Sequence, residues 1–280
     1  MRREENVKVF LDAMCLCKEN VTIKTATDTA KNQQQVILET DSFNSSLNIL
    51  YDTQARIIAS QKRSYEAASF YKDMTVCVHN FASASNPGGG VTKGSGAQEE
   101  CLCRCSGLYF CLNTRPMWEQ FYAPHRAKQD PIHNDDIIYT PSVIVFKSDT
   151  AEPHILEEKD WYKVNVITCA APNLRKRPSN DFNAGDGDYA AKLTDQELMS
   201  IHEKRLRRIL DVALMNKNEV VILGAFGCGA FENKPEIVAM AAKNVLREYR
   251  YAFVTIEFAI YCSPWDTANY KVFNEILEEI

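Results

Sequence analysis

Apolar residues recur at helical spacing near the start of the chain. Val9, Phe10, Ala13 and Cys17 share one face of a helix that this spacing predicts over residues 5–17. Further along, residues 75–80 form a short apolar run rich in Val, which is typical of a buried strand. That run leads directly into a glycine-rich segment.

The same patterns divide the rest of the chain into short strands and helices. Strands are predicted over residues 36–39, 56–59, 137–140, 143–146, 164–170, 220–223 and 254–261, and helices over 64–71, 98–112, 116–122, 195–215, 235–249 and 267–277. Ser64 and Thr194 are candidate N-caps, and residues 172–188 are polar and irregular, which predicts a flexible surface loop.

The second half of the chain alternates strand and helix. This order predicts an α/β fold, in which a sheet carries helices on both faces. Ligands of such sheets bind beyond the carboxyl ends of the strands. Two glycine-rich loops follow predicted strand ends, at residues 86–96 and 224–231, so both are expected to face one crevice.

Length and composition favour one globular unit. The chain has 280 residues, 45% of them apolar, and no Pro-rich or low-complexity linker divides it. We therefore expect a single domain over residues 1–280.

Charge and cysteine content restrict the partners and the compartment. A net charge of −5 argues against direct sequence-specific nucleic-acid binding, although backbone N–H groups can still bind an anionic small ligand. The N-terminus lacks the apolar core of a signal peptide, and no apolar run reaches the roughly 20 residues that a membrane helix needs. We expect a cytoplasmic protein that makes no membrane contact, with its ten cysteines reduced.

The segment from Asn86 to Glu100 carries the strongest chemical signal. Gly88, Gly89 and Gly90 let a backbone approach a ligand closely, and Glu99 and Glu100 follow at the start of a predicted helix. The other interpretation is a tight strand-to-helix connection with a solvated glutamate pair in the first helical turn.

The second glycine loop could wrap a diphosphate with its backbone N–H groups. It contains Gly224, Gly227 and Gly229, with Phe231 at its end as an aromatic surface for a ribose and Phe226 as the competing aromatic. Its other interpretation is a strand-to-helix turn with a buried aromatic residue.

Together these motifs resemble those of poly(ADP-ribose) glycohydrolases (PARGs). Gly-Gly-Gly, a spacer and Gln98-Glu99-Glu100 look like the signature of that family, and residues 80–83 and 106–109 resemble its microbial type. The similarity continues at 223–231 and 258–266. It implies a macrodomain-like fold, a mixed sheet sandwiched between helices, with an N-terminal helical extension over residues 1–70 and a catalytic core over residues 71–280.

The resemblance also implies roles for individual residues. Glu100 would be the catalytic acid/base, and Glu99 the second catalytic residue, which positions the ribose hydroxyls. Asn86 is the preferred contact of the terminal ribose over Asn80 and Ser83, although a turn-forming Asn-Pro is the alternative. The full set of implied substrate-binding residues is Asn86, Gly88, Gly89, Gly90, Val91, Gln98, Gly224, Gly227, Cys228, Gly229, Ala230 and Phe231.

The implied reaction is hydrolysis of the ribose–ribose O-glycosidic bond of poly(ADP-ribose), with release of ADP-ribose through an oxocarbenium-like transition state. The substrate would be the polymer or an ADP-ribosylated protein, and we expect exo-cleavage. The reaction needs no cofactor and no metal. Cys101, Cys103, Cys105 and Cys111 lack zinc-site spacing and are expected to be buried as small apolar residues.

Two other functions use the same pocket. One is a non-catalytic ADP-ribose-binding macrodomain, against which the two adjacent glutamates argue, and the other is a mono-ADP-ribosyl hydrolase. A zinc-dependent enzyme is a more distant alternative.

Overall fold

A seven-stranded mixed sheet forms the centre of the computed structural model, which describes residues 2–43, 49–181, 183–263 and 265–278. The strand order is β1-β4-β5-β3-β6-β7-β2, in which β4 is antiparallel to β1 and β5 and the remaining pairs are parallel. The strands are β1 Gln35–Ile37, β2 Arg56–Ser60, β3 Val76–Phe81, β4 Ile137–Val145, β5 Tyr162–Cys169, β6 Val220–Leu223 and β7 Thr255–Ala259.

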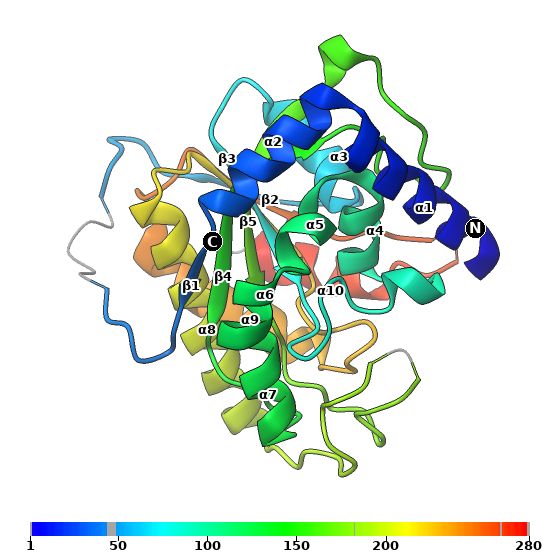
Figure 1. The fold of residues 1–280 in the computed structure, drawn as a ribbon. Helices are drawn as coiled ribbons and strands as arrows, with labels where there is room; N and C mark the ends of the chain where they lie inside the picture. The colour runs from blue at the N-terminus through cyan, green and yellow to red at the C-terminus, as the bar shows by residue number, and fades with distance from the viewer. Residues whose placement is uncertain (1, 44–48, 182, 264, 279–280) are drawn as a thin grey trace.

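Helices cover both faces of this sheet (Figure 1). The α-helices are α1 Arg3–Glu19, α2 Val21–Asn32, α3 Ser64–Ala68, α4 Gln98–Cys105, α5 Leu108–Leu112, α6 Arg115–Met117, α7 Ala123–Lys128, α8 Asp195–Met215, α9 Pro235–Leu246 and α10 Ala268–Leu277. Figure 1 shows α1 and α2 in blue on one side of the sheet and α8 in yellow on the other.

Alternating strand residues separate two hydrophobic clusters, one on each face. On β3, Val76 and Val78 pack with residues of α3, α4 and α5, whereas Cys77 packs with residues of α8 and α9. Successive side chains of a strand point to opposite faces, so one apolar strand supplies both clusters. This arrangement confirms the α/β sandwich expected from the sequence.

Most predicted elements are present, and two helix predictions need correction. Helix α2 was not predicted. The helix predicted over 98–112 is two helices, because the chain breaks at Ser106 and Gly107. A Cβ on Gly107 would lie 2.4 Å from Oγ1 of Thr27 on α2, so glycine allows close contact of the two segments.

Of three further local predictions, two are corrected by the structure and one is confirmed. Residues 137–140 and 143–146, predicted as two strands, lie mostly in the single strand β4, which has a bulge between Thr140 and Val143. Arg63, and not Ser64, occupies the N-cap of α3. Thr194 does cap α8, since its hydroxyl accepts a hydrogen bond from the Glu197 N–H, a contact that stabilises a helix by about 1 kcal/mol.

The first 70 residues contain more than helices. Strands β1 and β2 lie at opposite edges of the sheet, so the N-terminal segment contributes to the same layer as the rest of the chain. The division at residue 70 and the single-domain organisation stay predictions. Within the described residues, no helix has the length and apolar character needed to cross a membrane.

The direction of the strands determines where a site forms. Strands β5, β3, β6 and β7 are neighbours and run parallel, so their carboxyl ends meet at one edge of the sheet. The loops that follow β3 and β6 are the two glycine-rich segments, which are thereby brought to the same edge.

Candidate active site

A cleft of about 700 Å³ opens at this edge of the sheet. Its walls come from the loops after β3, β5, β6 and β7 and from the first turns of α1 and α4. The predicted site residues that line it are Gly89, Gly90, Gln98, Glu99, Glu100, Gly227, Gly229, Ala230 and Phe231. The two glycine loops therefore share one cleft, as the sequence predicted.

Glu99 and Glu100 begin α4 and are both buried, with exposed fractions of 3% and 7%. Glu99 accepts hydrogen bonds from the Asn80 side chain at 3.2 Å and from the Ser83 N–H at 2.8 Å, and the Gly88 N–H is a third donor. Oε1 of Glu100 accepts from the Gly90 N–H at 2.8 Å, whereas its buried Oε2 has no partner among the described residues. One carboxylate is thus held by protein donors, and the other keeps one oxygen available.

Burial raises the pKa of both carboxyl groups. The pKa of Glu99 rises to about 8, first through desolvation and then through the neighbouring charge of Glu100. The pKa of Glu100 is also raised by desolvation, against the lowering effects of the Gly90 N–H and Arg104. Because the two groups are adjacent, they titrate as a pair that retains one proton near neutral pH.

The available oxygen indicates where that proton resides. The hydrogen bonds from the Asn80 side chain and the Ser83 N–H favour the ionised form of Glu99, since each stabilises negative charge, whereas Glu100 accepts one, from the Gly90 N–H. Oε2 of Glu100 meets no donor among the described residues. We therefore assign the shared proton to Glu100, where it can be donated to a ligand in the cleft.

This pair predicts an alkaline limit on any reaction that needs the proton. We expect kcat to fall as the pH rises through about 8, because the pair then loses its last proton. The free energy of unfolding should also fall as the pH rises from about 4.5 to about 8, because the folded state then holds a proton that the unfolded chain has released. A kcat–pH profile with thermal unfolding across pH 5–9 checks both; a flat profile through pH 9 would contradict the assignment.

The N–H groups of the first glycine loop donate hydrogen bonds to the two glutamates and to carbonyl groups of the loop. The N–H groups of Gly88 and Gly90 serve Glu99 and Glu100, and that of Gly89 donates to the Asn86 carbonyl. Val91 is fully buried in the hydrophobic cluster and its N–H donates to the Gly88 carbonyl. This loop therefore positions the carboxylates more than it offers donors to an anion.

The second loop differs in this respect. Within the described chain, the N–H groups of Gly227, Gly229, Ala230 and Phe231 donate to no backbone carbonyl. Gly229 and Ala230 are exposed, and all four residues line the cleft. Backbone N–H groups without a backbone acceptor on neighbouring residues can bind an anion, so this loop suits a diphosphate.

The two competing aromatic residues occupy different environments. Phe226 is 7% exposed and packs edge-on against His79 and His202. Burial lowers the pKa of His79 to about 3, with a further contribution from His202, so this histidine is a neutral core residue. Phe231 is half-buried, and the Arg175 guanidinium lies 5.4 Å from the centre of its ring. Phe231 is the better placed of the two for a ligand.

Several predicted site residues lie outside the lining of the cleft. These are Asn86, Gly88, Val91, Gly224 and Cys228. The N–H of Cys228, predicted as a donor to the ligand, donates to the Ala225 carbonyl in a turn. Burial raises the pKa of the Cys228 thiol, so it stays protonated and is unsuited to act as a nucleophile.

Asn86 and Gln98 make their polar contacts within the protein. The Asn86 amide donates to the Ala184 carbonyl at 2.8 Å and accepts from Arg126 at 2.6 Å. The Gln98 amide accepts from the Phe81 N–H and donates to the His79 carbonyl, which fixes the start of α4 on β3. Their contacts with a ribose stay predictions.

Basic residues also lie differently from the sequence interpretation. Arg205 and Arg208 of α8 are only 2% and 9% exposed, although charged residues of a long helix usually face solvent, whereas Arg207 pairs with Glu248 near the surface. Arg175 was assigned to a solvated loop, yet it lines the cleft. Arg3 and Arg63 line it too, and nothing in their local sequence distinguished them from surface cations.

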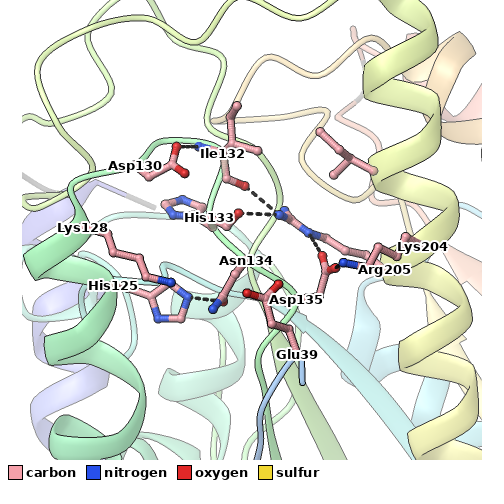
Figure 2. Close-up of a pocket in the computed structure, with 11 residues that line it drawn as sticks. Glu39, His125, Lys128, Asp130, Ile132, His133, Asn134, Asp135, Lys204 and Arg205 are labelled. Carbon is pink, nitrogen blue, oxygen red and sulfur yellow. Dashed lines mark hydrogen bonds and ion pairs between the residues drawn. The ribbon is translucent and has the colours of Figure 1, made fainter. Parts of the chain in front are cut away.

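The buried Arg205 belongs to a second, smaller cavity of about 290 Å³ between α7, α8 and the segment before β4. Figure 2 shows its guanidinium bonded to Asp135 and to the carbonyl groups of Ile132 and His133. Its walls share no residue with the cleft. The paired charges make it a structural region that connects α8 to the chain before β4.

The cysteines carry no metal geometry. All ten are free thiols, and Cys103, Cys105 and Cys111 are buried as expected, whereas Cys101, which was also expected to be buried, is partly exposed and lines the cleft. Among the described residues, no group of three or more His, Cys, Asp or Glu side chains could hold a metal ion.

A family comparison agrees with this geometry. The family model described as "Microbial-type PARG, catalytic domain" matches residues 5–148, more than half of the 280-residue chain. The chain belongs to this PARG family. A comparison with curated proteins gave no match.

Solved PARG structures are similar over nearly the whole chain. The PARG from Thermomonospora curvata is 26% identical, with a TM-score of 0.83 over 98% of this chain and 99% of that chain. The same enzyme bound to the inhibitor ADP-HPD is 27% identical, with a TM-score of 0.80 over 97% and 99%. The PARG from Deinococcus radiodurans in complex with ADP-ribose is 28% identical, with a TM-score of 0.76 over 90% and 97%. These similarities confirm the macrodomain-like fold.

Proposed function

We propose that this chain is a poly(ADP-ribose) glycohydrolase that hydrolyses the ribose–ribose O-glycosidic bond and releases ADP-ribose. One observation carries the proposal: the unpartnered Oε2 of Glu100 shares a cleft with Gly227, Gly229, Ala230 and Phe231, whose N–H groups donate to no backbone carbonyl within the described chain. In this proposal the buried acid lies at the glycosidic bond of a ribose, and the loop binds the diphosphate that is attached to the same ribose. Membership of the PARG catalytic-domain family supports the same activity.

The proposed reaction uses one carboxyl group twice. Protonated Glu100 donates its proton to the leaving ribose oxygen as the C–O bond breaks, which leaves an oxocarbenium-like ribose. The resulting Glu100 carboxylate then accepts a proton from the attacking water, whose oxygen bonds to the anomeric carbon. ADP-ribose leaves, and Glu100 is protonated again.

Glu99 has a different part in this proposal. Its ionised carboxylate lies next to the reacting centre, where negative charge stabilises an oxocarbenium-like transition state. It also suits hydrogen bonds from the ribose hydroxyls. The donors from Asn80 and Ser83 support this part, because they orient the carboxylate before substrate binds.

Polymer and ADP-ribosylated protein are both proposed substrates, with ADP-ribose as the product. Ten unpaired cysteines suit a reducing compartment, so we propose a cytoplasmic location. The direct test is turnover of defined poly(ADP-ribose) and of a singly ADP-ribosylated peptide by the purified protein. Faster release of ADP-ribose from polymer is expected; hydrolysis of the peptide alone would indicate a mono-ADP-ribosyl hydrolase, and binding without turnover a reader.

Phe231 should contribute to affinity for ADP-ribose. Removing the ring in Phe231→Ala should raise the Kd by about tenfold, the effect expected for one lost aromatic contact. Phe231→Tyr keeps the ring and should bind nearly as the unmodified chain does. Calorimetric titration with ADP-ribose measures both, and an unchanged Kd for Phe231→Ala would remove the proposed stacking contact.

A further inference from the structure

The loop after β5 is built into the site, although its sequence predicted a flexible surface segment. Asn173, Asn183 and Asp186 are 0%, 7% and 0% exposed. We call residues 173–181 and 183–187 the Asp186 loop. Asn183 and Arg175 of this loop line the cleft.

Asp186 connects the parts of this loop. Its Oδ2 accepts from the Asn173 side chain at 2.8 Å and from the Asn183 side chain at 2.5 Å. Its Oδ1 accepts from the Ser85 hydroxyl at 2.6 Å. Burial alone would raise the pKa of Asp186, but His133 and the hydroxyl and amide donors lower it, so the group is an ionised acceptor.

A short chain of hydrogen bonds leads from this carboxylate to Glu99. Asn183, held by Asp186, accepts from the Ser83 hydroxyl at 2.7 Å. The Ser83 N–H donates to Oε2 of Glu99 at 2.8 Å. The segment that carries Ser83 and Ser85 is therefore fixed on one side by Asp186 and contacts the glutamate pair on the other.

On its other side, Asp186 lies next to His133, which lines the second cavity. The Arg205 guanidinium donates to the His133 carbonyl at 3.0 Å, as Figure 2 shows. His133 has a φ of +60°, and its Nε2 lies 3.6 Å from Oδ2 of Asp186, too long for a hydrogen bond. Helix α8 thus holds the residue that contacts Asp186.

We propose that Asp186 is a positioning residue that holds the Asp186 loop and Ser83 in place and thereby orients Glu99. The inference rests on the proposed function. An acceptor-only side chain suits this position, because three donors converge on it and it is 0% exposed. An amide in its place would oppose one of these donors with an N–H group.

The test compares Asp186→Asn with Asp188→Asn, an exposed position next to the same loop. For Asp186→Asn we expect kcat on polymer to fall about tenfold or more. The alkaline limb should move to higher pH, because a displaced Ser83 N–H stabilises the ionised Glu99 less. Trypsin should cut faster after Arg175 and Lys176, whereas Asp188→Asn should behave as the unmodified chain does.

Ser85→Ala removes only one donor to Asp186 and replaces Asp186→Asn in this test if that variant does not fold. Smaller changes in the same direction in kcat, alkaline limb and trypsin cleavage support the inference. Unchanged values for the folded variant overturn it. If the unmodified chain hydrolysed no polymer, the proposed function would be wrong, while trypsin cleavage and the pH dependence of unfolding would still decide the role of Asp186.

Discussion

Replacing Glu100 with Gln should lower kcat for polymer hydrolysis by about 10²–10⁴-fold, the usual contribution of general acid–base catalysis. The amide keeps a carbonyl oxygen for the Gly90 N–H and places its NH₂ at the unpartnered Oε2 position. The fold and the diphosphate-binding loop should therefore be retained. ADP-ribose titration and release of labelled product from polymer measure the two effects separately.

Glu119→Gln is a suitable control, because Glu119 is an exposed residue that pairs with Arg115 far from the cleft lining. It should change neither quantity. Glu100→Gln should also flatten the pH dependence of stability, since the Glu100 charge is one cause of the raised pKa of Glu99. Normal turnover by Glu100→Gln would show that another group supplies the proton.

Gly89→Ala should lower kcat by about 10²-fold or more. A Cβ at this position would lie 2.6 Å from Oε1 of Glu100, and φ is +58°, a conformation that costs a non-glycine residue roughly 1–2 kcal/mol. The contact forces either the loop or the Glu100 side chain to move, and displacement of a catalytic group by about 1 Å can cost about 100-fold in rate. Steady-state kinetics on polymer measure the loss.

Gly96→Ala is the matched control for this substitution. Gly96 also lines the cleft near the start of α4, but the nearest atom to its added Cβ would be Nδ2 of Asn6 at an ordinary 3.7 Å. It should keep kcat within a few-fold of the unmodified chain. Equal losses for the two variants would mean that any methyl group in this region disturbs the site, and that the contact with Glu100 is not the cause.

The sequence predicted the strands and long helices well because their apolar residues recur with clear periods. Helix α2 was missed because four of its twelve residues are Thr and its apolar face is short. Its helical state depends on contacts with α1, α5 and β4. The break between α4 and α5 likewise depends on how closely Gly107 approaches Thr27, a contact between segments 80 residues apart.

The resemblance predicted one cleft for both glutamates and the second glycine loop, and the structure has Glu99, Glu100, Gly227, Gly229, Ala230 and Phe231 in its lining, but not Cys228. The sequence could not show which N–H groups were already used. Gly88 and Gly90 look like phosphate-binding residues until the structure shows their N–H groups on the carboxylates of α4. Arg175 and Asp186 were missed for a similar reason, because a polar loop becomes a site wall only through its contacts with distant segments.

A crystal structure of Glu100→Gln with ADP-ribose tests the central claim most directly. Diphosphate oxygens are expected within about 3.2 Å of the N–H groups of Gly227, Gly229, Ala230 and Phe231. The anomeric carbon is expected next to the side chain of residue 100. A diphosphate held elsewhere, or an anomeric carbon turned away from that side chain, would contradict it.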